Sequence, residues 1–203
     1  RKRLLYLALF AIAGTSVQLV FPAVFSSWHI VTMTLFLMYG LLSEFDSSFD
    51  TLTGMHNRAA FDKACREFRD MNRFAVIITD INDFKQINDN YGHEFGDLVL
   101  KKVAEIVKIS FGGPGYCFRV GGDEFYIICK NTDRDKIEDH LKRMTAALSI
   151  EQINEKPLPG LAYGYSIRDG SSSFDLQKML VEADQNMYAC KKIQKDPGRG
   201  VDG

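Results

Sequence analysis

Residues 116–129 read YCFRVGGDEFYIIC, two β-rich runs around the pairs Gly121-Gly122 and Asp123-Glu124. A glycine pair between two such runs predicts a tight β-hairpin, and the glycines also let the backbone approach a ligand closely. Taken alone, four residues of this kind more often form an ordinary polar turn. Their meaning therefore depends on the residues around them.

A second acidic residue, Asp80, follows the apolar run at 74–78 (FAVII). A short continuous apolar run predicts a buried central strand. If the hairpin lies beside this strand, Asp80, Asp123 and Glu124 converge at one edge of a sheet. Mg²⁺ prefers such carboxylates together with phosphate oxygens. In isolation, Asp80 could equally be only a helix cap.

The remaining periodicity predicts helices and one more strand after residue 50. Apolar side chains at helical spacing predict helices, and the run LAYGYSI predicts a strand. This order of elements predicts an α+β fold, with helices packed on a sheet that contains antiparallel strands. The predicted helices are 59–71, 98–109, 137–148 and 176–195, and the predicted strand is 161–167.

The composition changes abruptly near residue 43. The 203 residues carry a net charge of -1, so no basic field indicates nucleic acid as a partner. Residues 4–42 contain no Asp, Glu, Lys or Arg, whereas charged residues are frequent afterwards. We therefore expect a membrane segment at 1–42 and a connector at 43–49. A domain at 50–195 and a flexible tail at 196–203 complete the prediction.

Two apolar runs, 4–25 and 28–42, make up the first segment. The first run is long enough to cross a bilayer, which needs about 20 helical residues, and the second is rather short. Basic residues at 1–3 place the start of the chain on the cytoplasmic side. We expect a transmembrane helical hairpin, and two alternatives remain open, a buried hairpin in a soluble domain and a remnant of a larger membrane sensor. A signal peptide is disfavoured because a second apolar run follows.

Four segments together resemble the GGDEF family of diguanylate cyclases, and they cover residues 50–195. Residues 119–125 (RVGGDEF) match the defining signature of that family. Residues 80–97 resemble its core, residues 50–58 (DTLTGMHNR) resemble its entry motif, and residues 183–191 (ADQNMYACK) resemble its closing helix. All four stand in the family's order. The resemblance implies the condensation of two GTP molecules into cyclic di-GMP.

The resemblance also implies roles for individual residues. It implies that Asp80, the Ile81 backbone carbonyl, Asp123 and Glu124 bind Mg²⁺ or Mn²⁺, and that the last two, with Lys85, act in catalysis. An Asp acceptor suits the donors on the guanine edge and penalises adenine. The residues implied in GTP binding are Asn88 and Asp97 at the guanine, and Phe84, Lys85, Gly121, Gly122, Lys191 and Lys195 near the phosphates.

One domain of this family binds one GTP, so the resemblance implies a homodimer. With the membrane segment, it places the protein at the inner or plasma membrane, its GGDEF domain in the cytoplasm. An alternative is a GTP-binding sensor domain of the same fold that has lost catalysis. The complete acidic, lysine and asparagine set disfavours this alternative.

The chain departs from the family pattern at three places. Residues 112–115 read GGPG where the family often has an Arg-x-x-Asp product site, so we expect no feedback inhibition there. Asn82 stands at a position that is commonly Asp. Gln194 and Lys195 stand where a Gly-Arg pair is common, and Arg199 is a candidate to replace that arginine. We expect His93, Asn57, Arg58 and Arg119 to have structural roles.

Overall fold

The computed structural model describes residues 27–46, 48–68, 71–113, 115–130, 132–169 and 175–195, together with positions 6, 9, 12, 13 and 16. The chain divides into two compact units, Arg1–Ser48 and Phe49–Gly203. The second unit contains every residue that the sequence predicts to act on GTP. The predicted tail at 196–203, with Arg199, lies outside the described residues.

The first unit contains helix α2 (Ser27–Asp46), which includes the second apolar run. It continues through Asp46, so part of the predicted connector at 43–49 is helical. Over the residues that the structure describes, no helix has both the length and the apolar character that a membrane crossing requires. Most of the first apolar run lies outside those residues. The predicted transmembrane hairpin is therefore not confirmed.

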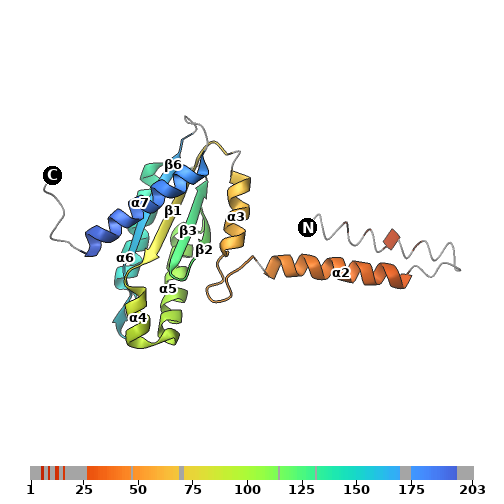
Figure 1. The fold of residues 1–203 in the computed structure, drawn as a ribbon, viewed down its shortest axis with the longest axis horizontal. Coiled ribbons are helices and arrows are strands. Elements are labelled where there is room, and N and C mark those ends of the chain that lie inside the picture. Colours follow the sequence, from red (N-terminus) through yellow and green to blue (C-terminus); the bar gives the residue numbers. More distant parts are fainter. Residues whose placement is uncertain are drawn as a thin grey trace. The chain divides into compact units, whose positions relative to one another are not determined.

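The second unit is built on a four-stranded antiparallel sheet in the order β2-β3-β1-β6 (Figure 1). The predicted hairpin and both other predicted strands are confirmed. The central strand continues beyond the predicted 74–78, so that Asp80 lies within it. The strands are β1 (Phe74–Ile81), β2 (Gly115–Arg119), β3 (Glu124–Lys130) and β6 (Leu161–Arg168).

Helices cover both faces of this sheet, which explains why β1 is apolar throughout. Helices α5 (His93–Phe111) and α6 (Arg134–Ile150) pack with Ala75 and Ile77 in one core cluster. On the other face, α3 (Arg58–Glu67) and α7 (Leu176–Lys195) pack with Val76 and Ile78. Successive side chains of a strand point to opposite faces. Both faces of β1 therefore bury apolar side chains, and the α+β prediction is confirmed.

Gly164 of β6 lets α7 lie directly against the sheet. A Cβ at this position would lie 2.1 Å from the Met187 nitrogen and 2.2 Å from the Ala183 carbonyl oxygen. No side chain fits in that space, so the close approach of helix and strand requires glycine. The same helix carries Lys191 and Lys195, and its seating on β6 therefore sets where these lysines lie.

Three elements were not predicted from the sequence. Helix α4 (Phe84–Tyr91) is only eight residues long, and its apolar side chains Phe84 and Ile87 are partly buried against the core. Two turns are too short for the helical period to be recognised from the sequence. Strands β4 (Gln152–Ile153) and β5 (Lys156–Pro157), of two residues each, form a small hairpin. Its two turn residues, Asn154 and Glu155, both have positive φ. Strands this short carry no detectable alternation of polar and apolar residues.

Candidate active site

The turn between β2 and β3 carries the acidic pair. The amide of Val120 donates to the Glu124 carbonyl oxygen (3.0 Å), closing the turn around Gly121 and Gly122. A Cβ at Gly121 would lie 2.7 Å from Glu124 Oε2, whereas a Cβ at Gly122 would meet nothing within 4 Å. Gly121 therefore leaves room for the Glu124 carboxylate as it is placed here, and the backbone at Gly122 is open to an incoming group.

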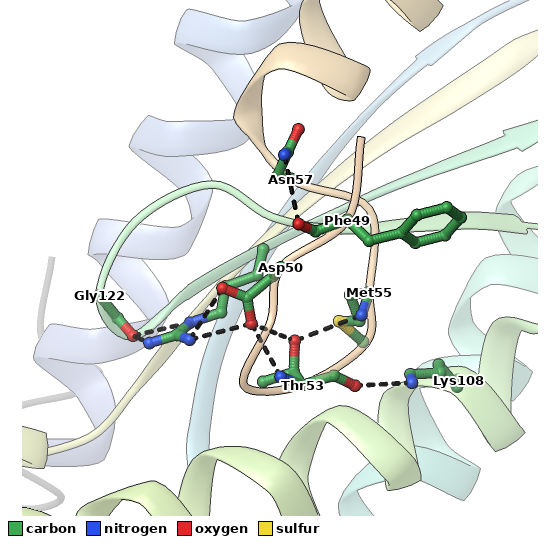
Figure 2. Close-up of polar contacts among 8 residues, drawn as sticks. Phe49, Asp50, Thr53, Met55, Asn57, Lys108 and Gly122 are labelled. Carbon is green, nitrogen blue, oxygen red and sulfur yellow. Dashed lines mark hydrogen bonds and ion pairs between the residues drawn. The ribbon is translucent and has the colours of Figure 1, made fainter. Parts of the chain in front are cut away.

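Arg119 holds this turn from the side, as the sequence predicted. Its Nη2 and Nε donate to the Gly122 carbonyl oxygen at 2.8 and 3.2 Å. Its Nη1 donates to both carboxylate oxygens of Asp50, at 3.0 and 3.2 Å (Figure 2). The planar guanidinium offers donors in several directions. It therefore joins the signature turn to the entry segment.

Asp50 is the centre of a second network, which Figure 2 shows on the entry loop. It accepts from the Thr53 amide (2.9 Å) and hydroxyl (2.6 Å), and Lys108 Nζ donates to the Thr53 carbonyl oxygen (2.8 Å). Burial raises the pKa of Asp50, but the hydrogen bonds from Thr53 and Arg119 and the charge of Arg119 outweigh it, so the pKa lies below its ordinary value. This role of Asp50 was not predicted from the sequence, although Asp is one of the residues whose side chains commonly shape turns.

The register of the sheet brings the predicted metal-binding carboxylates together. Asp80 of β1 is paired with Glu124 of β3, and the Ile81 amide donates to the Asp123 carbonyl oxygen (3.2 Å). Partial burial raises the pKa of Asp123, and repulsion from Asp80 raises it further. Burial and then repulsion from Asp123, Asp80 and Asp184 raise the pKa of Glu124. The three carboxylates therefore lie close enough to repel one another.

Lys191 of α7 partly neutralises this acidic group. Its Nζ lies 2.5 Å from Asp80 Oδ1, and the Asp80 side chain is only 13% exposed. Among the described residues, no three His, Cys, Asp or Glu side chains are grouped tightly enough to hold a metal ion. The donor chemistry nevertheless fits Mg²⁺, because a divalent cation between Asp80, Asp123 and Glu124 would relieve their repulsion. The Ile81 carbonyl belongs to the same strand end.

Apart from the two glycines of the signature turn, the predicted phosphate-binding residues belong to α4, which follows the turn after β1, and to the end of α7. Phe84 and Lys85 begin α4, and Asp83 before them has φ 53, the left-handed region. Lys195 Nζ lies 2.7 Å from Asp83 Oδ1, and this hydrogen bond with the carboxylate charge raises the pKa of the lysine. The pair of Lys191 with Asp80 therefore fastens the end of α7 to β1, and the pair of Lys195 with Asp83 fastens it to this turn.

The predicted guanine-binding residues come from the crossing of α4 and α5. Asn88 lies on α4 and exposed Asp97 on α5. A Cβ at Gly96 would lie 1.9 Å from Asn88 Oδ1, so Gly96 leaves the space that the Asn88 side chain occupies between the two helices. Asn88 Oδ1 is buried without a hydrogen-bond partner. A buried acceptor of this kind favours binding of a ligand that donates a hydrogen bond.

Two other structural roles can be compared with the prediction. Asn57 is the N-cap of α3, since its Oδ1 accepts from the Ala60 amide at 3.0 Å, so it shapes the entry segment as predicted. His93 is exposed at the first position of α5. Asp184, which raises the pKa of Glu124, was not expected near the site.

Comparison with known proteins agrees with this geometry. A family model described as "Diguanylate cyclase, GGDEF domain" matches residues 47–197. Diguanylate cyclase DgcS of Shewanella oneidensis is 27% identical over 151 residues, which is 70% of this chain and 49% of DgcS. Diguanylate cyclase DosC of Escherichia coli is 29% identical over 74% of this chain and 34% of DosC. The chain therefore spans half or less of the length of these relatives.

Solved structures show the same fold. The coiled coil and GGDEF domain of DgcB from Caulobacter crescentus, in complex with c-di-GMP, has a TM-score of 0.67 at 25% identity, over 83% of this chain and 92% of that one. The FimX GGDEF domain from Pseudomonas aeruginosa has a TM-score of 0.65 at 19% identity, over 72% and 94%. The second likeness concerns the fold alone.

Proposed function

The chain belongs to the GGDEF domain family of diguanylate cyclases, and from this membership we propose that it condenses two GTP molecules into cyclic di-GMP and releases two pyrophosphates. The observation that carries the proposal is the pairing of Asp80 with Glu124 across two strands, with Asp123 beside them. An acidic group at a sheet edge, next to a turn with an open backbone at Gly122, suits a metal-bound triphosphate.

The proposed chemistry consists of two equivalent phosphoryl transfers. In each one, the ribose 3′-oxygen of one GTP attacks the α-phosphorus of the other, and the bond to the leaving pyrophosphate breaks. The hydroxyl proton passes to the carboxylate of Asp123 or Glu124. Mg²⁺ or Mn²⁺, when bound by Asp80, Asp123, Glu124 and the Ile81 carbonyl, would supply charge that stabilises the phosphates. Positioning and electrostatics account for most catalysis of this kind.

The other residues of the site bind and orient the nucleotide. Lys85, Lys191 and Lys195 offset the phosphate charge, with the amides around Phe84. Asn88 and Asp97 pair with the guanine edge, and an Asp acceptor left without its donor would disfavour adenine. The existing pair of Lys191 with Asp80 keeps this lysine beside the place where the phosphates would lie.

Each domain holds one such site, and a cyclic product requires two substrates in opposite orientation. We therefore propose a homodimer in which two GTP-loaded domains face each other.

We also propose that the uncharged run at 4–25 tethers the protein to the inner or plasma membrane, with the GGDEF domain in the cytoplasm. Membrane fractionation of the tagged chain would test the tether, and recovery in the soluble fraction alone would contradict it.

The test of the activity is incubation of the purified chain with GTP and Mg²⁺ at high protein concentration, followed by chromatography of the products. We expect cyclic di-GMP from the parent and none from Asp123→Ala or Glu124→Ala. The matched control is Asp62→Ala, which removes an exposed carboxylate on α3. GTP binding without product, even after forced dimerisation, would instead identify a GTP-binding sensor.

A further inference from the structure

The last turn of α7 is held to the turn between β1 and α4 by more than its two ion pairs. Gln194 lies between Lys191 and Lys195 in sequence, and its amide group contacts two other elements. Its Nε2 donates to the Leu161 carbonyl oxygen of β6 at 3.2 Å. Its Oε1 accepts from Asn82 Nδ2 at 2.6 Å. One side chain therefore joins helix α7, strand β6 and the end of β1.

Asn82 is itself fixed in place. Its backbone amide donates to the Gly160 carbonyl oxygen at 3.0 Å, so its main chain is tied to the segment that leads into β6. It follows Ile81, the last residue of β1, and precedes Asp83, the left-handed residue before α4. The Gln194 contact thus reaches the point where the strand of Asp80 becomes the predicted phosphate-binding turn.

The two amides match each other chemically. A carboxylate at position 82 has no hydrogen to donate and would face Gln194 Oε1, another acceptor. Turning the Gln194 amide around would supply a donor but would remove the bond to the Leu161 carbonyl. Asn82 and Gln194 are both positions at which the chain departs from the usual family pattern. The structure shows that these departures, 112 residues apart, contact each other.

We propose that Asn82 and Gln194 are positioning residues for the triphosphate of the nucleotide. Their hydrogen bond holds the last turn of α7 over the phosphate-binding turn. Lys191 and Lys195 lie on either side of Gln194 along this helix. By fixing the end of the helix, the bond therefore determines the positions available to both lysine ammonium groups. When GTP binds, its phosphates replace the carboxylates that these lysines contact in the free protein. The inference rests on the proposed function, because it assumes that this site accepts GTP.

A positioning role for Gln194 can be distinguished from a general contribution to folding by comparing the binding of a triphosphate with that of GMP. The lysines act on the β- and γ-phosphates, so loss of the Gln194 contact weakens binding of a triphosphate. Binding of GMP depends mainly on the α4–α5 crossing, where Asn88 and Asp97 lie, and stays unchanged. A general loss of structure would weaken both nucleotides alike.

The experiment is titration of the whole chain with Mg²⁺ and a GTP analogue whose α,β-bridging oxygen is replaced by methylene, and separately with GMP. For Gln194→Ala we expect a rise of about three- to tenfold in the dissociation constant of the analogue, the range of one hydrogen bond. The GMP constant stays the same. Gln185→Ala, the same change at an exposed position of α7, leaves both constants unchanged.

A second pair of variants tests the bond itself. Asn82→Asp should weaken analogue binding as Gln194→Ala does. The double variant N82D/Q194R should restore it, because a guanidinium can donate both to the introduced carboxylate and to the Leu161 carbonyl. The inference would be overturned if Gln194→Ala weakened binding of the analogue and of GMP equally, or weakened neither. It would also be overturned if the double variant N82D/Q194R did not restore binding of the analogue. If the parent protein bound no GTP, both the inference and the proposed function would fail. If it bound GTP but formed no product, only the cyclase proposal would fail.

Discussion

The Arg119 guanidinium lies 3.0 Å from Asp50 Oδ1 and 2.8 Å from the Gly122 carbonyl oxygen, and so joins residues 72 positions apart through one side chain. Both partners are largely shielded, with 14% of the Arg119 and 23% of the Asp50 side chain exposed. The conformation of the signature turn therefore depends on the segment at which the domain begins.

Substitution of Asp50 tests this dependence. Asp50→Asn should reduce the free energy of unfolding at pH 7 by about 2 kcal/mol, the scale of hydrogen bonds to a charged group. Its pKa is lower in the folded protein, so the carboxylate contributes fully above the unfolded pKa of about 3.9. This contribution disappears as the pH falls through the folded pKa. Denaturant unfolding at pH 7 and pH 3 measures the difference, which should shrink at the lower pH.

The control for that measurement is Asp62→Asn. Asp62 forms an exposed i,i+4 pair with Arg58 on α3, and such pairs contribute about 0.5 kcal/mol or less. A loss at Asp50 no larger than this, or one that does not change with pH, would contradict the proposed network.

Removal of the Glu124 charge should raise the stability of the protein while abolishing its proposed activity. Burial and neighbouring carboxylates raise the pKa of Glu124, so its ionisation costs stability as the pH rises through the folded pKa. Glu124→Gln should therefore melt at a higher temperature than the parent at pH 7 without metal, while forming no cyclic di-GMP. Added Mg²⁺ should stabilise the parent more than the variant, since ligands stabilise the state that binds them. The measurement is the melting temperature of both proteins with and without Mg²⁺. If Mg²⁺ raised the melting temperature of both equally, Glu124 would not be a metal ligand.

If the proposed activity holds, cyclic di-GMP should not inhibit it through residues 112–115. No charged side chain stands there to bind a phosphate. A Cβ at Gly115 would lie 2.9 Å from both Ile127 Cγ2 and the Phe111 carbonyl oxygen, so the strand has no room for an acidic side chain at that point. Initial rates with and without cyclic di-GMP should agree. Calorimetric binding of product that G112A/G113A abolishes would contradict the prediction.

Gly164→Ala should reduce both stability and activity. The added methyl overlaps backbone atoms of α7, and a helix cannot yield as a flexible side chain does. We expect a loss of about 2 kcal/mol, within the range for overpacked cores, and a higher KM for GTP because α7 carries Lys191. Gly113→Ala is the control, since a Cβ there meets nothing within 4 Å. Unchanged unfolding and KM in Gly164→Ala would show that α7 is seated by other contacts.

Elements with a strong local signal could be predicted from the amino-acid sequence. The apolar run at 74–78 predicted the central strand, and Gly121-Gly122 predicted the hairpin, because burial and backbone freedom are properties of short segments. The resemblance of four segments to the GGDEF family supplied the residues that are proposed to act on GTP. Helix α4, with eight residues, and the two-residue strands β4 and β5 escaped prediction because segments this short contain too few residues to establish a period.

Which of these residues contact one another follows from the packing of the folded chain. Asp80 pairs with Glu124 because the antiparallel register of β1 and β3 places them opposite each other. Lys191 reaches Asp80, and Gln194 reaches Asn82, because Gly164 lets α7 lie flat on β6. Contacts of this kind depend on how sheet and helix pack, and packing depends on the whole chain at once. A local pattern can therefore supply the chemical groups of the site, while their arrangement follows from the fold.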